Sequence, residues 1–146
     1  MDKFMKAAFE EAKKGLGEGG IPIGSVLVKK GRIIGRGHNM RVQNGDPTAH
    51  AEIECLRNAG RIGDYKDTVL YSTLSPCYLC SGAATLFRIP KVVMAEDENF
   101  KGGEDLMRAH GIEVVNTRDK EIAKFFREWI TKNLRLWGED IGKPKP

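Results

Sequence analysis

Two short segments of the chain carry residue types that bind zinc and transfer protons. The first, residues 50–52, reads HAE, and the second, residues 75–80, reads SPCYLC. Imidazole nitrogen and thiolate sulfur are ligands that zinc prefers. Cys77 and Cys80 are three residues apart, so on a helix their side chains share one face. We therefore expect His50, Cys77 and Cys80 to hold one Zn²⁺ ion per chain.

Three protein ligands leave the fourth position of a tetrahedral zinc ion open to water, as in catalytic zinc sites. Zinc lowers the pKa of bound water from about 15.7 towards 7, so hydroxide is available at neutral pH. Hydroxide can attack the ring carbon that bears the amino group of a nitrogen heterocycle. Glu52 is then placed to carry the proton of the water to a ring nitrogen and to the departing amine. The pattern predicts a zinc-dependent hydrolytic deaminase.

Each of the two segments is predicted to lie at the start of a helix. The Ser-Pro pair at 75–76 favours a helix cap followed by a first helical residue, so both cysteines belong to the opening turn. The positive end of a helix lowers the pKa of thiols placed there. In a regular helix His50 and Glu52 would project to nearly opposite sides. We therefore place His50 in the first turn, capped by Thr48 or Asp46, so that two helix starts face one ion.

The spacing of apolar residues predicts helices and strands in alternation. An amphipathic helix spans residues 4–16, and strands at 25–28 and 32–35 follow around a tight turn. The remaining predicted elements are a helix at 48–56, a strand at 68–71, a helix at 77–87, a strand at 91–94, a helix at 104–109, a strand at 112–115 and a helix at 120–136.

This order of elements predicts the fold class. Strands that alternate with helices form largely parallel sheets, and the opening hairpin supplies an antiparallel edge. The expected fold is α/β, a three-layer α/β/α sandwich around a mixed central sheet of about five strands. We expect one domain spanning residues 1–146, with a loose tail at 142–146.

Composition narrows the classes of function and location. The chain has 146 residues and a net charge of +4, with 40% hydrophobic and 30% charged residues. It has no apolar run near the roughly 20 residues of a membrane span. Basic and acidic residues are interleaved, which indicates a solvated surface more than a nucleic-acid interface. An odd number of cysteines and a start without a signal-peptide pattern predict the reducing cytoplasm.

The combination of His-x-Glu with Pro-Cys-x-x-Cys is the known pattern of zinc-dependent nucleobase deaminases. At these residues the chain resembles the cytidine-deaminase-like superfamily and, more narrowly, the yeast-type cytosine deaminases that act on the free base. The narrower resemblance also rests on segments 18–24, 35–41, 65–68, 73–77, 99–101 and 137–142. It implies the three-layer fold, one zinc ion, a nucleobase substrate and a homodimer.

The same resemblance implies which residues contact the base. The Asn39 side chain and the Ala51 backbone amide would hold its polar edge, while the Ser75 carbonyl and Asp140 would lie near the departing amino group. Asn39 could instead be a turn residue.

Two aromatic residues, Phe100 and Trp137, would pack over the ring by the same resemblance. A small flat ligand needs apolar walls with a few directed polar groups, which suits this assignment. The alternative is that both are core aromatics.

Several alternatives stay open. The yeast-type family has Gly where this chain has Ala51, and residues 46–52 are closer to the transfer-RNA adenosine deaminases. We expect conversion of free cytosine to uracil and ammonia, because a lid formed by residues 137–142 would exclude a polynucleotide. Deamination of transfer-RNA adenosine, or of another small base such as guanine, is the alternative. A structural zinc site with Cys55 as fourth ligand is a third hypothesis. His38 lacks ligand spacing and is interpreted as a surface or packing residue.

Overall fold

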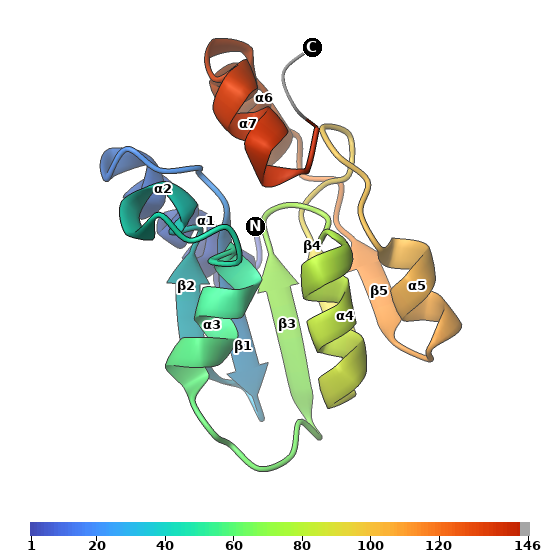
Figure 1. Cartoon of the computed structure of the whole chain (residues 1–146). Coiled ribbons are helices and arrows are strands. Elements are labelled where there is room, and N and C mark those ends of the chain that lie inside the picture. The colour runs from blue at the N-terminus through green and yellow to red at the C-terminus, as the bar shows by residue number, and fades with distance from the viewer. Residues whose placement is uncertain (144–146) are drawn as a thin grey trace.

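The fold is a mixed sheet with helices on both faces, and the computed structural model describes residues 1–143 (Figure 1). Of the predicted tail, residues 144–146 lie outside this described part. The elements in chain order are α1 (Lys3–Gly17), β1 (Gly24–Lys29), β2 (Arg32–His38), α2 (Arg41–Asn44), α3 (Ala51–Ala59), β3 (Thr68–Ser72), α4 (Tyr78–Phe87), β4 (Lys91–Met94), α5 (Glu104–Ala109), β5 (Glu113–Asn116), α6 (Lys120–Lys132) and α7 (Leu134–Asp140).

The five strands lie in the order β2-β1-β3-β4-β5. β1 is antiparallel to both β2 and β3, whereas β3, β4 and β5 are parallel to one another. The hairpin between β1 and β2 turns at Lys30 and Gly31, which both have positive φ, at 51° and 79°. Two consecutive residues of this kind form the tight turn that matches the twist of paired strands. The predicted mixed sheet with an antiparallel edge is confirmed.

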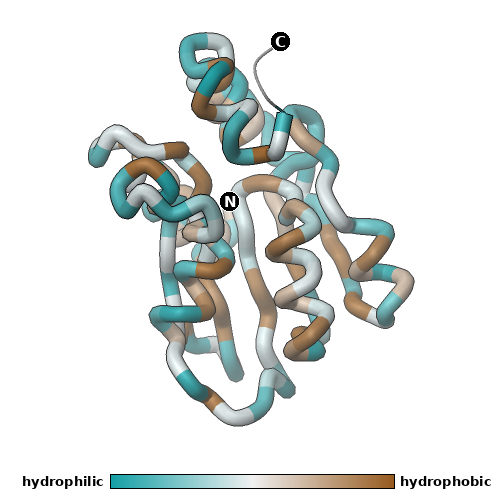
Figure 2. The backbone as a smooth tube through the Cα atoms, viewed as in Figure 1, coloured by the Kyte–Doolittle hydropathy of each residue, from teal (hydrophilic) through white to brown (hydrophobic). Residues whose placement is uncertain are grey.

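The helices form a layer on each face of the sheet, which confirms the predicted three-layer α/β/α sandwich (Figures 1 and 2). Successive strand residues point to opposite faces, so Val26 and Leu27 belong to different cores. On one face the residues of α1 and the start of α6 pack against the strands. These residues are Met5, Ala8, Phe9, Ala12 and Ile122. On the other face α3, α4 and α5 supply Cys55, Leu56, Ala84 and Met107.

Two glycines of β2 allow α3 to lie directly on the sheet. A Cβ atom at Gly37 would lie 2.6 Å from the Cys55 backbone nitrogen, and one at Gly35 would lie 2.6 Å from the Cys55 carbonyl oxygen. Any larger residue would push the helix away, because backbone atoms cannot give way. The glycines therefore set the height of α3, and with it the place of its first turn.

The starts of two helices differ from the prediction. α3 begins at Ala51 and not at 48, because Asp46 accepts hydrogen bonds from both the backbone nitrogen and the hydroxyl of Thr48, at 2.9 and 2.8 Å. This local turn competes with helix formation. α4 begins at Tyr78, so the prediction of Ser75 as cap is wrong, and Cys77 occupies the cap position.

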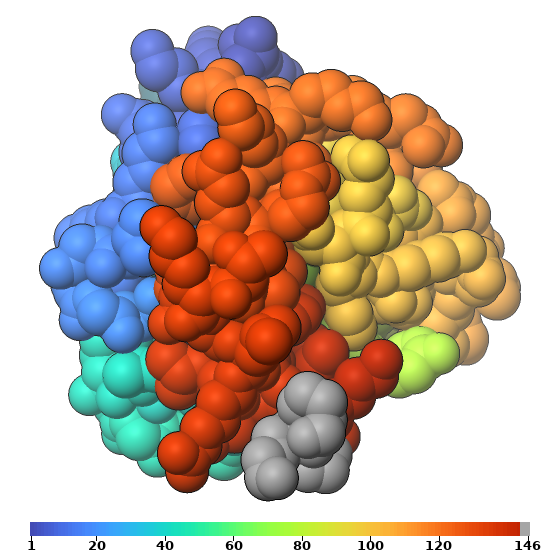
Figure 3. All heavy atoms as spheres, turned by 90° about the horizontal axis from the view of Figure 1, so that it is seen from above, coloured from blue at the N-terminus to red at the C-terminus, as the bar shows by residue number. Residues whose placement is uncertain are grey.

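The C-terminal region differs more. The single helix predicted at 120–136 is two helices, because Asn133 leaves the helical region at φ −141° and separates α6 from α7. Figure 1 shows α6 and α7 beyond one end of the strands, and Figure 3 shows this segment running across the middle of the molecule when that end is seen from above. Its residues Phe126, Trp129 and Trp137 join Ile21 and Leu74 in a third apolar cluster at this end. Of the helices in residues 1–143, none has the length and apolar character to cross a membrane.

Candidate functional site

The two predicted zinc-binding segments meet where α3 and α4 begin. His50 is the N-cap of α3 and Cys77 is the N-cap of α4, and both have extended backbone angles. The two side chains touch, with 3.4 Å between Cys77 Sγ and His50 Nδ1. A residue at the cap has left the helical path, so the opposed directions expected for His50 and Glu52 in a regular helix no longer apply. The prediction of two helix starts facing one point is confirmed, although His50 precedes the first turn.

The structure brings together donors that suit zinc. One ligand atom each from His50, Cys77 and Cys80 lies within 4.8 Å of the others, and among residues 1–143 these form the one His, Cys, Asp or Glu group of this kind. Two thiols and one imidazole are a typical donor set for Zn²⁺. Cys55 lies elsewhere, buried in the core with its thiol 3.5 Å from the Gly35 carbonyl. The hypothesis of Cys55 as a fourth ligand is therefore not supported.

The charges at this point call for a cation. The pKa of Cys77 is lowered to about 4, because Cys80 and His50 hydrogen-bond to its sulfur. The pKa of Cys80 is raised well above its usual value by its hydrogen bond to Cys77 and by burial. A second thiolate beside the first would be repelled, so a divalent cation is the counter-charge that the sulfur pair needs to be fully ionised.

Glu52 is the second residue of α3 and is 4% exposed. Its Oε2 atom lies 3.2 Å from the Ser72 hydroxyl at the end of β3. Burial and the negative charge of Cys77 raise the pKa of Glu52 to about 7. A carboxyl group with such a pKa can accept and release protons near neutral pH, as a general acid and base must.

A small cavity opens against these residues. It measures about 20 Å³, and it is lined by Ile23, Asn39, His50, Ala51, Glu52, Leu74, Ser75, Cys77, Phe100, Trp137, Asp140 and Ile141. All the residues predicted to contact a base are among them, so the structure gathers the predicted pocket from five separate regions of the chain. A cavity of this size holds about one water molecule, so a ring can enter only if a wall moves.

The polar side of the pocket is a chain of contacts across the molecule. Asn39 Nδ2 donates to Asp140 Oδ1 at 3.2 Å, and the same oxygen lies 3.6 Å from His50 Nε2. Asn39 Oδ1 accepts from the Arg41 backbone nitrogen at 2.9 Å. Asn39 is thus both a turn residue and a pocket residue, because its amide oxygen accepts within the turn and its amide nitrogen donates to Asp140 in the pocket wall. Burial raises the pKa of Asp140.

Ser75 lines the cavity, and its hydroxyl is engaged by other residues. The hydroxyl donates to Glu104 Oε2 at 2.8 Å and accepts from the Gly102 backbone nitrogen at 3.0 Å. These contacts occupy the side chain. The assignment of the Ser75 carbonyl to the substrate stays a prediction.

The aromatic side of the pocket combines wall and core. Phe100 and Trp137 meet edge to face, with ring centroids 5.7 Å apart, and Trp137 also meets Phe126 at 5.0 Å. Trp137 is 7% exposed and lines the cavity. Trp137 therefore lines the cavity and also packs against Phe126 of α6, while the contact of both aromatics with a base stays a prediction.

Four residues at the site were not predicted from the sequence. Ile23, Leu74 and Ile141 line the cavity, and Ser72 contacts Glu52. Ser72 ends a buried strand, and a polar residue at the carboxyl end of such a strand is a usable signal, because ligands of α/β sheets bind at that edge. The three apolar residues carry no local mark that separates them from the core.

Comparison with known proteins supports the zinc-binding assignment. The family model described as the cytidine and deoxycytidylate deaminase zinc-binding region matches residues 1–96. A cytosine deaminase of Candida albicans is 42% identical over 144 residues, which cover 97% of this chain and 96% of that protein. A tRNA-specific adenosine deaminase of Streptococcus pyogenes is 42% identical over 119 residues, 79% of this chain and 75% of that protein.

Solved structures show the same fold. A structure from work on A-to-I editing by tRNA deaminases at the wobble position aligns with TM-score 0.75 and 30% identity, covering 84% of this chain and 97% of that one. The guanine deaminase of Nitrosomonas europaea aligns with TM-score 0.76 at 22% identity, covering 88% and 83%. The family match spans well over half of the chain and includes Glu52 with all three predicted ligands. This chain therefore belongs to the family of the cytidine and deoxycytidylate deaminase zinc-binding region.

Proposed function

We propose that this chain hydrolyses free cytosine to uracil and ammonia. The observation that carries the proposal is the end-to-end similarity to a cytosine deaminase, which leaves neither chain with a large unmatched segment. The geometry supports it, because α7 places Trp137 and Asp140 against the cavity. An enclosed pocket favours a small flat molecule over a base that is attached to a polynucleotide.

In this proposal His50, Cys77 and Cys80 hold the zinc ion. When bound, zinc acts as a Lewis acid and makes a reactive nucleophile available from water at neutral pH. Glu52 carries the two protons of the water one after the other, the first to the ring nitrogen and the second to the departing amine, so that cytosine and water become uracil and ammonia. Ser72 lies against the Glu52 carboxyl and restricts its orientation.

The other pocket residues bind and orient the base. The Asn39 side chain and the Ala51 backbone amide hold its polar edge, while the Ser75 carbonyl and Asp140 face the amino group that leaves. Phe100 and Trp137 cover the ring and exclude bulk water. Removing water strengthens each of these polar contacts.

The alternative substrates are a transfer-RNA adenosine and another free base such as guanine. The first is favoured by the 42% identity to the Streptococcus pyogenes tRNA-specific enzyme and by Ala51. It is disfavoured by the position of α7, which would have to leave the site before a polynucleotide could enter.

We also propose a homodimer in which α4 faces a second copy of the chain. Tyr78 and Leu86 on this helix are 74% and 73% exposed, and Leu79 and Phe87 are more than 40% exposed. Figure 2 shows hydrophobic segments along α4. Four exposed apolar side chains on a single short helix exceed the scattered exposure of monomer surfaces.

Because its three cysteines are free thiols, we place the protein in the cytoplasm.

The substrate assignment is tested by measuring ammonia release from cytosine, adenine, guanine and an adenosine-containing anticodon stem-loop. We expect turnover of cytosine and none of the stem-loop. Activity on the stem-loop without activity on cytosine would reverse the order of the two hypotheses.

The ligand assignment predicts the metal content of cysteine variants. Cys77→Ser and Cys80→Ser should each lose most of the zinc, because a hydroxyl is a poor replacement for a thiolate ligand. Cys55→Ser is the matched control and should keep about one zinc per chain. Elemental analysis of the purified proteins measures this. Zinc loss in the control but not in the other two variants would move the site elsewhere.

The proton-carrier role predicts that Glu52→Gln separates metal binding from turnover. The amide cannot carry a proton, so kcat should fall at least about 100-fold while zinc content stays unchanged. The exposed Glu139 provides the control, since Glu139→Gln should keep kcat within about twofold of the parent. Turnover retained in Glu52→Gln would remove this residue from its role.

The dimer predicts that Leu86→Glu yields monomers, because two buried charges would face a dry interface. Leu134→Glu is the control. It changes another exposed leucine, which lies on α7 and outside the proposed interface, and it should leave the dimer intact. Light scattering during size-exclusion chromatography distinguishes one chain mass from two. A parent protein that elutes as a monomer at all accessible concentrations would rule the dimer out.

A further inference from the structure

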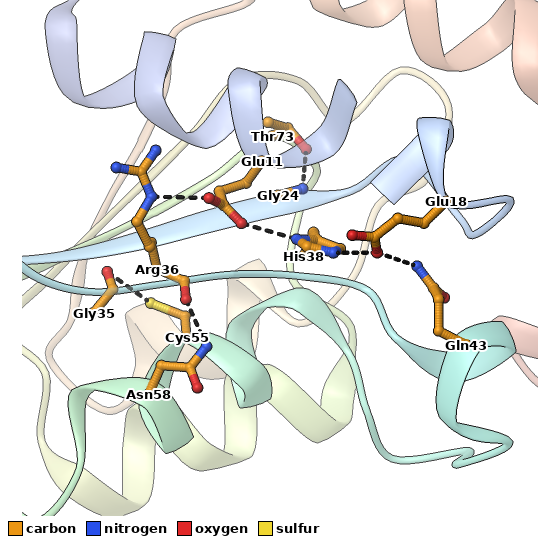
Figure 4. A network of polar contacts seen from close by, with 10 residues as sticks. All are labelled: Glu11, Glu18, Gly24, Gly35, Arg36, His38, Gln43, Cys55, Asn58 and Thr73. Atoms are coloured by element: carbon orange, nitrogen blue, oxygen red, sulfur yellow. Dashed lines mark hydrogen bonds and ion pairs between the residues drawn. The ribbon is translucent and has the colours of Figure 1, made fainter. Parts of the chain in front are cut away.

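His38, which directly precedes Asn39 in the chain, lies between two carboxyl groups. Its Nδ1 atom lies 2.8 Å from Glu11 Oε1 and its Nε2 atom lies 2.8 Å from Glu18 Oε1 (Figure 4). His38 is 8% exposed and Glu11 7%. The geometry therefore describes a buried imidazole with a carboxyl group against each ring nitrogen, and not a surface residue.

The two carboxylates also accept hydrogen bonds from side chains of β2 and α2. Glu11 Oε2 accepts from Arg36 Nε at 2.8 Å, and Glu18 Oε1 accepts from Gln43 Nε2 at 3.1 Å (Figure 4). These contacts lower the pKa of Glu18, chiefly through its hydrogen bonds to His38 and Gln43. Hydrogen bonds between charged groups are stronger and more directional than neutral ones. The cluster thus fixes its members in place.

Glu18 holds the chain on both sides of Asn39. His38 directly precedes Asn39, and Gln43, on α2, follows it by four residues. The same Glu18 oxygen accepts from both. Gly20 makes the second contact possible, because a Cβ atom there would lie 2.4 Å from the Gln43 amide.

Asn39 needs such support because it lies just beyond the sheet. The pairing of β1 with β2 ends at the Gly24 and His38 pair. After it, the Asn39 backbone nitrogen donates to the Ile23 carbonyl at 3.0 Å, and its side chain reaches across to Asp140. A small rotation of this segment would move the Asn39 amide within the pocket, where an error of about 1 Å is costly.

We propose that His38, clamped by Glu11 and Glu18, is a positioning residue that sets the place of the Asn39 amide in the substrate pocket. The kinetic part of this inference rests on the proposed function, since it takes Asn39 as a contact to cytosine. Replacing either carboxylate by an amide of the same shape removes its negative charge and so weakens its hold on the ring, because hydrogen bonds to charged groups are the stronger ones. The effect should appear in substrate binding and not in the proton transfer performed by Glu52.

The test compares Glu18→Gln with Glu10→Gln in the zinc-loaded protein. Glu10 is exposed and lies on α1 next to Glu11, so it controls for loss of one negative charge. We expect Glu18→Gln to raise KM for cytosine about fivefold to tenfold with kcat within about twofold, and Glu10→Gln to change neither. Zinc content should stay the same in both variants. Equal KM values in the two variants would overturn the proposal.

A double-mutant cycle separates positioning from general stability. In the Asn39→Ala background, Glu18→Gln should have no further effect on KM, because the group that it positions is absent. If Glu18→Gln raises KM by the same factor with and without Asn39, the cluster does not act through Asn39 and the proposal fails.

Nuclear magnetic resonance gives a readout that is independent of turnover. The side-chain amide signals of Asn39, assigned by their loss in Asn39→Ala, should shift or broaden in Glu18→Gln and stay in place in Glu10→Gln. Unmoved signals in Glu18→Gln would overturn the positioning role. If the signals move but cytosine is not turned over, the proposed substrate fails while the positioning role stands.

Discussion

The site depends on one constraint: two helices, α3 and α4, begin at the same end of the strands. β2 and β3 are both antiparallel to β1, so they run in the same direction and end at the same edge. The chain that leaves β2 leads to the start of α3, and the chain that leaves β3 leads to the start of α4 (Figure 1). His50 and Cys77 therefore meet as helix caps, although 27 residues separate them. Their backbone amides and the positive helix ends also favour the thiolate form of the cysteines.

Enclosure of the site depends on the opposite end of the chain. α7 follows a break at Asn133 and brings Trp137 and Asp140 back over the edge where α3 and α4 begin. One oxygen of Asp140 contacts both Asn39 and His50, so a single carboxylate connects the pocket wall to the predicted metal ligands. Without this return the cavity would be an open edge of the sheet, exposed to bulk water. The same return that excludes water also restricts which molecules can reach Glu52.

Two clusters of ionisable side chains lie next to Asn39, one in contact with its side chain and one at the preceding residue. The first cluster contains the sulfur pair, His50, Glu52 and Asp140, whose negative charge calls for a cation. The second cluster places His38 between Glu11 and Glu18, and Arg36 forms an ion pair with Glu11. Buried charges are tolerated only when they are paired and hydrogen-bonded, and the buried members of each cluster have such partners. One is completed by a metal ion, and the other is complete within the protein and gives rigidity to the segment that includes Asn39.

The sequence by itself was sufficient to predict the donor set, the order of most elements and the α/β class, and to propose Glu52 as the proton carrier. These depend on residue chemistry and on the periodicity of nearby residues, which are local. β4 and α5 begin and end as predicted, because the residue pattern changes at both ends of each element. The resemblance carried by several motifs also indicated the pocket residues, and the structure does place them around one cavity.

The tertiary structure alone decided where those residues lie relative to one another. The cap position of His50 follows from the turn at Asp46, and the split of the last helix follows from the backbone angles of Asn133. Both features interrupt a helix locally, and the periodicity of apolar residues does not predict them. Asn39 and Asp140, 101 residues apart, meet only because α7 folds back over the sheet edge. His38 was interpreted from spacing as a surface or packing residue. Its two carboxylate partners come from a helix packed across the sheet and from the residue that caps that helix, so only the packed structure could show the clamp.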